Sequence, residues 1–380
     1  MTDDPPNPAL LPSGLHDLLP PEADREAALV ERLAASFSAH GYERVKPPLL
    51  EFEDSLFAGT GAAVAEQTFR LMDPVSQRMM GLRADTTPQV ARIAATRLGH
   101  WARPLRLSYA GQVLRVSGTS RDATRQLPQA GIELIGVDSA EADAEVAAVT
   151  VAALADVGMR DVSLDITLPR LTPTLFEALG VPAEARRALS RALDRKDAAA
   201  VAAQGSAAGI PPHLLPSLLA AAGPAEGALA ALAAAPLPAP ARAIADHAAR
   251  VVAAIAAAAP ALRITLDPVE FRGLRYHTGV SFTLFGPGLT GELARGGRYM
   301  SGEEPATGMT LYPDALRRAL TPPPGRKRLF LPLGTPAAQA AALRAEGFAT
   351  VAALSPADTP QRLRCTHRLD ASGRPVTLEE

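Results

Sequence analysis

Polar side chains share one face of a predicted strand that spans residues 125–135. Because strand side chains alternate between two faces, Gln129, Gly131 and Glu133 lie on the same side. Gln129 and Glu133 are separated by about 13 Å of strand, so they can contact opposite ends of one small extended molecule. Gly131 leaves room for such a ligand to approach the backbone. With Arg115 and Arg125 alongside, this mixture of charges suits a zwitterion or a nucleotide better than a lipid or a sugar.

The element that positions these groups is a predicted hairpin over residues 105–136. Alternating apolar residues from Leu105 to Val113 predict the first strand, and Arg115 falls on its buried face. A turn-forming run at residues 117–120 connects the two strands. The alternative is that the polar residues form the solvent face of an antiparallel sheet. Against this alternative, Glu133 stands among Ile132, Leu134 and Ile135, where an unpaired carboxylate would be costly to bury.

Two further candidate groups lie outside the hairpin. Asp85 comes directly before a predicted helix that Thr86 or Thr87 caps. It is either a turn residue or a charged group of the site. Tyr276 lies in the glycine-containing segment 271–279, and it is either a half-buried strand aromatic or part of a pocket.

Three stretches together resemble the signatures of class II aminoacyl-tRNA synthetases, in their histidyl version. Residues 105–136 resemble the second signature, and residues 41–51, with two prolines, resemble the first. Residues 271–279, FRGLRYHTG, are similar to the histidine-specific segment of the histidyl enzymes. The resemblance covers about residues 12–320. It implies an α+β fold with a mainly antiparallel sheet, flanking helices and a helical insertion. The pattern of residues 328–380 predicts in addition a small C-terminal α/β unit of strand, helix, strand and hairpin.

The resemblance also implies a histidine site. Asp85 stands where the family has a Glu that receives the ammonium group of the substrate, and Arg272 stands where an Arg lies close to the carboxylate. Tyr276 and His277 match a pair of tyrosines that lines the imidazole pocket, with His277 in place of the second and Arg275 in place of an Asp. The residues expected to bind histidine are Asp85, Arg115, Gln129, Glu133, Arg272, Tyr276 and His277.

The groups expected to hold ATP are changed. The third signature of the synthetases is Gly, Gly and Arg, and counting from Gly308 the next two positions hold Tyr312 and Ala315. In the second signature, Ser117 replaces an acid and Ala123 replaces a basic residue. Amino-acid activation depends on positioned cations that stabilise charge on phosphorus. We therefore expect no catalytic residues, no aminoacylation and no cofactor.

This combination of losses resembles the regulatory subunits of ATP phosphoribosyltransferase, a family of histidyl-synthetase paralogues. The resemblance implies control of the first step of histidine biosynthesis, a short-form catalytic subunit as partner, and histidine as effector. It also implies self-association through residues 41–51 within a hetero-oligomer. Two alternatives remain, a divergent histidyl-tRNA synthetase and a free-standing amino-acid ligase.

Composition and breaks in pattern predict the organisation of the 380 residues. We expect a flexible start at 1–11, a synthetase-like core at 12–168 and 261–320, a helical insertion at 169–260, and a small domain at 321–380. The last is too short for the usual anticodon-binding domain of the synthetases.

The charge balance and the single cysteine exclude several classes of protein. A formal charge of −2 gives no electrostatic footprint for nucleic acid, so tRNA is not expected as a partner. Cys365 alone cannot form an intrachain disulfide, and its neighbour His367 lacks a second ligand pair for zinc. No apolar run approaches the roughly 18 residues of a membrane span. The sequence therefore predicts a soluble cytoplasmic protein without metal.

Overall fold

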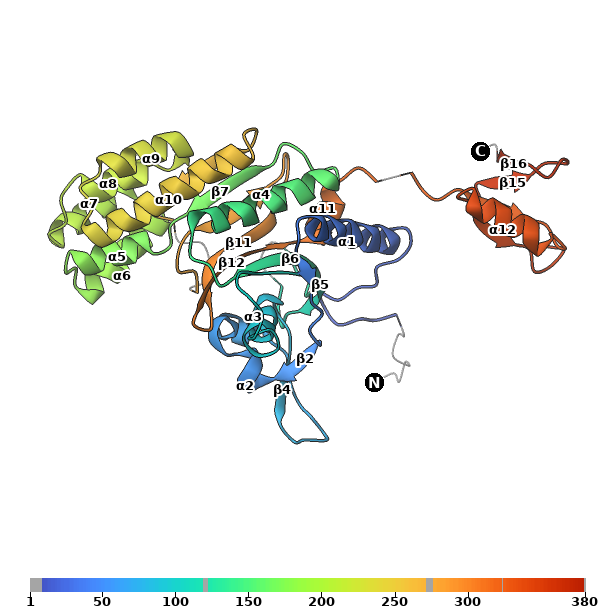
Figure 1. The fold of residues 1–380 in the computed structure, drawn as a ribbon, viewed down its shortest axis with the longest axis horizontal. Helices are drawn as coiled ribbons and strands as arrows, with labels where there is room; N and C mark the ends of the chain where they lie inside the picture. The colour runs from blue at the N-terminus through green and yellow to red at the C-terminus, as the bar shows by residue number, and fades with distance from the viewer. Residues whose placement is uncertain (1–8, 119–121, 271–275, 323, 379–380) are drawn as a thin grey trace, which may run out of the picture. The chain divides into compact units, whose positions relative to one another are not determined.

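The chain is described by a computed structural model that covers residues 9–118, 122–270, 276–322 and 324–378. It divides into two compact units, residues 1–320 and 321–380. Each is described by itself (Figure 1).

A nine-stranded sheet is the centre of the first unit. Only the β1–β5 and β7–β9 pairs are parallel, and the other neighbours are antiparallel. This confirms the expected α+β class with a mainly antiparallel sheet. In spatial order the strands are β1 (Glu43–Arg44), β5 (Leu105–Leu114), β6 (Gln126–Ile135), β12 (Glu304–Leu311), β11 (Glu292–Ser301), β10 (Ser281–Phe285), β7 (Ser163–Thr167), β9 (Arg263–Asp267) and β8 (Gly223–Pro224).

Helices cover both faces of this sheet, and the alternation of β6 decides which residues meet them. Ala130, Ile132 and Leu134 join the large core formed with α1 (Glu22–Ala39), α4 (Ala140–Asp156) and α11 (Pro313–Ala319). Gly131 and Glu133 point to the opposite face. There α3 (Thr87–Thr96) packs with Leu105, Leu107 and Tyr109 of β5. Figure 1 shows α1 and α4 on one side of β5 and β6 and α3 on the other.

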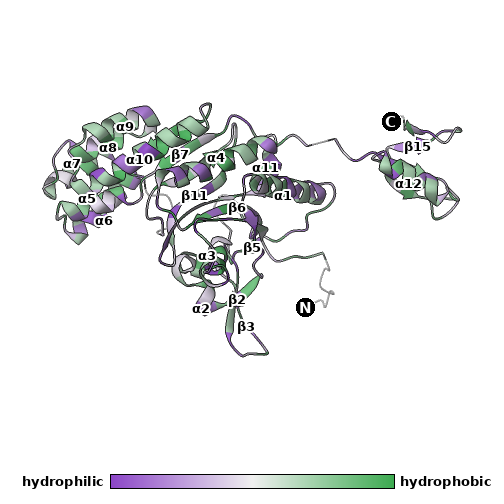
Figure 2. Cartoon of the chain, in the orientation of Figure 1, coloured by the Kyte–Doolittle hydropathy of each residue, from purple (hydrophilic) through white to green (hydrophobic). Residues whose placement is uncertain are grey.

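The insertion is a set of six helices that share the large core. The longest, α10, packs against α4 and α5, and its buried side carries Ala241, Ala245, Ala248 and Ile255. Green hydrophobic segments alternate with purple hydrophilic ones along these helices (Figure 2). The segment also contributes the short strand β8 to the sheet, so it is not wholly helical. The helices are α5 (Leu171–Ala178), α6 (Ala183–Asp194), α7 (Ala198–Ala207), α8 (Leu214–Ala220), α9 (Ala225–Ala234) and α10 (Ala239–Ala258).

The segment of residues 42–51 is divided between two sheets. Its first part, β1, joins the central sheet, whereas β2 joins a small sheet of order β2-β4-β3. Pro47 and Pro48 lie between them, and a proline lacks the N–H that a continuous ladder needs. The small sheet and its helices are β2 (Leu50–Phe52), α2 (Glu53–Leu56), the 3-10 helix η1 (Gly59–Gln67), β3 (Arg70–Met72) and β4 (Met79–Leu82).

The second unit contains the expected strand, helix, strand and hairpin. Its sheet has the order β14-β13-β15-β16, and Leu329 and Leu331 of β13 pack against Ala340 and Leu343 of α12. The elements are β13 (Arg328–Leu331), α12 (Ala337–Ala345), β14 (Ala349–Ala352), β15 (His367–Leu369) and β16 (Pro375–Thr377). Across both units, none of the described helices has the length and apolar character needed to cross a membrane.

The close approach of β11 and β12 predicts the effect of one substitution. A Cβ at Gly296 would lie 2.0 Å from the carbonyl oxygen of Gly308 and 2.7 Å from Cα of Met309. Because both are backbone atoms, Gly296→Ala should lower the free energy of unfolding by about 1–3 kcal/mol. Urea unfolding followed by the fluorescence of Trp101, the single tryptophan, measures this.

The matched control is Gly227→Ala in α9, where no atom lies within 4 Å of the new Cβ. Alanine favours a helix over glycine, so this variant should be as stable as the wild type or slightly more so. An equal decrease in the free energy of unfolding in both variants would contradict the explanation by backbone contact at Gly296.

Candidate functional site

A buried carboxyl group lies at the centre of the site. Glu133 on β6 is only 1% exposed. One carboxylate oxygen accepts a 2.8 Å hydrogen bond from the Thr87 hydroxyl, and the other accepts a 2.8 Å bond from the Tyr299 hydroxyl. These donors come from α3 and β11, so the carboxyl group connects three elements of the fold. It is a hydrogen-bonded part of a site and not the solvent face of a sheet.

Burial changes the acidity of this carboxyl group. The loss of water around Glu133 raises its pKa to about 8, and the nearby charge of Asp85 acts in the same direction. The hydrogen bonds from Tyr299 and Thr87 oppose the rise without cancelling it. Near pH 7 the group is therefore mostly protonated, and it can ionise when a cationic partner is supplied.

Glycines make the space that this carboxyl group needs. Gly308 on β12 is the register partner of Glu133, and a Cβ there would lie 1.8 Å from a carboxylate oxygen of Glu133. Gly297 on β11 has φ +146. The pair Gly296-Gly297 lies within β11, where the lack of side chains allows the neighbouring backbone to approach closely.

Aromatic rings surround the carboxyl group. The Tyr276 ring lies 4.5 Å from that of His277 and meets the Tyr299 ring edge-on at 5.9 Å. The Tyr109 hydroxyl lies 2.6 Å from that of Thr310. Tyr276, His277 and Tyr299 border a small indentation, which we call the Glu133 pocket. Its lining is Thr87, Glu133, Tyr276, His277, Arg295, Gly296, Gly297, Tyr299, Gly308 and Thr310.

Asp85 and Gln129 form a second pair of polar groups beside this pocket. The Gln129 amide oxygen accepts hydrogen bonds from the backbone N–H of Thr86 at 3.1 Å and from its hydroxyl at 2.9 Å. The amide nitrogen donates to Asp85 at 3.2 Å. Thr86 occupies the N-cap position of α3 without a side-chain cap bond. The predicted N-cap position is thus confirmed, but the Thr86 hydroxyl donates to Gln129 and not to the end of the helix.

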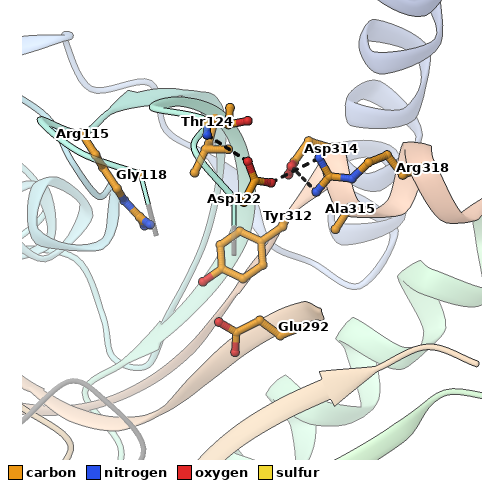
Figure 3. A pocket seen from close by; sticks show the side chains of 10 residues that line it. Arg115, Gly118, Asp122, Thr124, Glu292, Tyr312, Asp314, Ala315 and Arg318 are labelled. Atoms are coloured by element: carbon orange, nitrogen blue, oxygen red, sulfur yellow. Dashed lines mark hydrogen bonds and ion pairs between the residues drawn. The ribbon is translucent and has the colours of Figure 1, made fainter. Parts of the chain in front are cut away.

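Arg115 lies in a neighbouring cavity, shown in Figure 3, and is not part of the Glu133 lining. This cavity of about 570 Å³ has Tyr312 and Ala315 on its wall. Arg125 donates to the carbonyl groups of Arg115 and Ser13, at 3.2 and 3.0 Å.

The seven predicted residues therefore separate into groups. Glu133, Tyr276 and His277 line the first pocket, Asp85 and Gln129 pair beside it, and Arg115 lines the second cavity. Arg272 lies outside the described residues.

Acidic side chains occupy much of the second cavity. Arg318 on α11 forms ion pairs with Asp314 at 2.9 Å and with Asp122 at 3.5 Å. Glu292 lines the opposite wall (Figure 3). Glu292 in turn pairs with Arg295 at 3.7 Å, so among the described residues around this cavity Arg318 and Arg295 are both already paired with carboxylates.

Sequence reasoning missed three groups that line the Glu133 pocket and one group beside it. Tyr109, whose hydroxyl lies 2.6 Å from that of Thr310, is predicted on the buried face of its strand with Leu105 and Leu107, but not as part of the site. Tyr299 is two residues beyond Gly297 on the same strand, but nothing local indicates its partner 166 residues away. Thr87 was interpreted as a cap, and Thr310 carries no motif of its own.

The raised pKa of Glu133 predicts how stability depends on pH. Between about pH 4.3, the usual value for an exposed Glu, and pH 8, the folded state holds a proton that the unfolded state has released. The free energy of unfolding should therefore fall as pH rises through this window, by at most about 1.4 kcal/mol per pH unit from this group.

Glu133→Gln cannot titrate at this position, so its free energy of unfolding should lack this dependence on pH. From pH 5.5 to 7.5 the free energy of unfolding of the wild type should therefore fall relative to that of the variant. Urea unfolding at several pH values measures the difference. Glu177→Gln, at an exposed position, is the matched control, and its free energy of unfolding should change with pH as that of the wild type does. A Glu133→Gln curve that is also parallel to wild type would show that Glu133 titrates normally.

Comparison with known proteins places the chain in a family. The sequence profile described as Histidyl-tRNA synthetase matches residues 14–316. A protein of Paramagnetospirillum magneticum named ATP phosphoribosyltransferase regulatory subunit is 57% identical over 97% of each chain. A protein of the same name from Rhodospirillum centenum is 56% identical over the full length of both.

Solved structures agree on the fold. A Bacillus halodurans structure titled ATP phosphoribosyltransferase regulatory subunit/histidyl-tRNA synthetase superposes with a TM-score of 0.81 at 23% identity, covering 95% of this chain and 97% of the other. A histidyl-tRNA synthetase from Nostoc superposes with a TM-score of 0.77 at 18% identity, covering 97% and 96%. The chain thus belongs to the family of ATP phosphoribosyltransferase regulatory subunits, and it has the class II fold of histidyl-tRNA synthetase.

Proposed function

We propose that this chain is the regulatory, non-catalytic subunit of an ATP phosphoribosyltransferase, and that histidine binds in the Glu133 pocket. The observation that carries the proposal is an asymmetry between two adjacent cavities. The polar groups of the Glu133 pocket match those expected for an amino acid, whereas the Arg115 cavity has Ala315 where the synthetases place an Arg. The names of the relatives at 57% and 56% identity support the same function.

The charges of the second cavity argue against amino-acid activation. Activation by ATP needs cations around the transferring phosphorus. Here Arg318 is already paired with Asp314 and Asp122, and Glu292 pairs with Arg295 at 3.7 Å. A triphosphate would meet these carboxylates, so binding and catalysis are both disfavoured.

The polar groups of the first pocket fit a histidine molecule. Glu133 and Tyr276 would face the imidazole, while Asp85 and Gln129 would receive the ammonium group. Arg272, by resemblance to the family, would lie near the carboxylate. Charge-assisted hydrogen bonds of this kind contribute about 1.5–3 kcal/mol each.

The proposed partner is a short-form catalytic subunit of the phosphoribosyltransferase. A synthetase-like core with an altered nucleotide cavity has no evident reaction of its own, so its role requires another chain. We further propose self-association through residues 41–51 within the hetero-oligomer, and no binding of tRNA. The rival function, a divergent histidyl-tRNA synthetase, is favoured by Arg115, which remains in the nucleotide cavity.

Histidine-dependent exchange of pyrophosphate into ATP distinguishes the two functions. The purified chain should give only background exchange, because Ala315 stands where the synthetases place an Arg and Arg318 is already paired with Asp314. A genuine histidyl-tRNA synthetase assayed in parallel is the positive control. Exchange at the rate of that control would favour the synthetase function.

Co-expression with the short catalytic chain of the same organism tests the regulatory role. The two proteins should elute as one mixed complex whose phosphoribosyltransferase activity exceeds that of the catalytic chain alone. A stable complex of this kind should bury more than about 1,000 Å². Separate elution together with unchanged activity would count against the proposal.

Inhibition of the reconstituted complex by histidine tests the pocket. Glu133→Ala and Asp85→Ala should each raise the histidine midpoint at least tenfold, on the order of 1.4 kcal/mol, without preventing assembly. Glu133→Gln keeps the side-chain volume and should also weaken inhibition, because it cannot ionise against the imidazole.

Two controls accompany these variants. Arg125→Ala should have a smaller effect, because Arg125 bonds to the backbone near the nucleotide cavity. The exposed Asp246→Ala on α10 removes a carboxylate far from any proposed contact and should leave the midpoint unchanged. Unchanged midpoints for both Glu133→Ala and Asp85→Ala would place the effector elsewhere in the complex.

A further inference from the structure

A third cavity, of about 800 Å³, lies where the helical insertion meets the central sheet. One wall is α10, with Ile244 and His247, and the other is formed by Arg298 and Met300 of β11 and Pro305 of β12. Because strand side chains alternate, Arg298 and Met300 point away from Gly297 and Tyr299 of the Glu133 pocket. The cavity is therefore separate from the proposed histidine site.

Buried charges converge at one end of this cavity. Asp143 on α4 is fully buried, and one of its oxygens lies 3.0 Å from both Nε of Arg298 and Nε2 of His247. Arg298 also donates to the carbonyl groups of Val137 and Ser139, at 3.1 and 2.7 Å. The guanidinium group is thus held rigidly, with its orientation fixed before any ligand arrives.

The carboxylate of Asp138 contacts the outer side of the guanidinium group and is only weakly bound there. Asp138 lies 2.9 Å from Arg298, yet its side chain is 71% exposed, whereas the Arg298 side chain is 6% exposed. Because the Asp138 carboxylate lies largely in water, solvent screens its attraction to Arg298 and reduces the free energy that the pair contributes. Asp138 can therefore turn into water and leave its position at Arg298 to another carboxylate.

The other end of the cavity is apolar. Met300 and Pro305 are register partners, and Met300 is 39% exposed although it lies on a central strand. It lies two residues from Arg298, about 7 Å along the strand. Ile244 and Val280 complete this side. A molecule with an ionised head and a short branched tail matches this spacing.

We propose that this cavity binds a small aliphatic carboxylate. Its carboxylate would replace Asp138 at Arg298, next to His247, and its branched tail would pack on Ile244, Met300 and Pro305. Pockets with an apolar wall and a few preoriented polar groups are typical of small-molecule sites. The inference depends on the geometry of this cavity alone and stands apart from the proposed histidine function.

The test is a ligand-observed NMR titration of the full chain with 3-methylbutanoate, and with 3-methylbutan-1-amine and 3-methylbutan-1-ol as comparison probes. The carboxylate should bind saturably, with a dissociation constant on the order of millimolar for so small a ligand. The amine and the alcohol should bind more weakly. Equal or tighter binding of the amine would overturn the proposal.

Two variants locate the bound probe. Asp138→Ala removes the competing carboxylate and should tighten binding of 3-methylbutanoate about threefold, the size expected for one exposed charge pair. Ile244→Trp fills the apolar end and should abolish binding, with circular dichroism as the check on folding. Asp138 is exposed, so its variant gives a result even where Ile244→Trp does not fold.

The matched control is Asp246→Ala, which removes one exposed carboxylate from α10, beside His247 in sequence. It should leave the affinity for the probe unchanged. An equal gain in Asp246→Ala and Asp138→Ala would mean that net charge alone governs binding, and it would overturn the assignment to Arg298. No gain in Asp138→Ala would overturn it as well.

Discussion

The hydrogen bonds to the Glu133 carboxyl group are the constraint on which the arrangement of the first unit depends. A carboxyl group that is 1% exposed needs partners, and Thr87 and Tyr299 supply them from α3 and β11. Gly308 on the adjacent strand has no side chain and so leaves space for this carboxyl group. These residues are distant in sequence. One buried acid therefore fixes the relative positions of α3 and of the strands β11 and β12, which lie far along the sequence.

The two adjacent cavities have different physical characters. Around Glu133, the polar groups are buried, bonded to one another and framed by aromatic rings. Around Arg115, carboxylates pair with the available cation and line the wall. One fold can thus carry two cavities whose polar groups favour different chemistry.

The sequence predicts those parts of the site that depend on local pattern. Alternation over residues 105–136 predicts β5, β6 and the shared face of Gln129 and Glu133, as the structure confirms. It does not predict the contact of Tyr299, because that contact reaches from β11 across β12 to β6, nor the separation of Arg115 and Glu133 into different cavities. The division of residues 42–51 between two sheets depends on tertiary pairing, although Pro47 and Pro48 marked the place.

The protonated state of Glu133 has a consequence for the number of protons exchanged on binding. With a pKa of about 8, the free carboxyl group carries one proton, and a free imidazole loses its own above about pH 6.5. A carboxyl–imidazole pair in the proposed complex also carries one proton. Between these two pH values, association therefore neither takes up nor releases a proton. Histidine affinity would then be constant across neutral pH and weaken on either side, which makes the effector response insensitive to ordinary shifts in cellular pH.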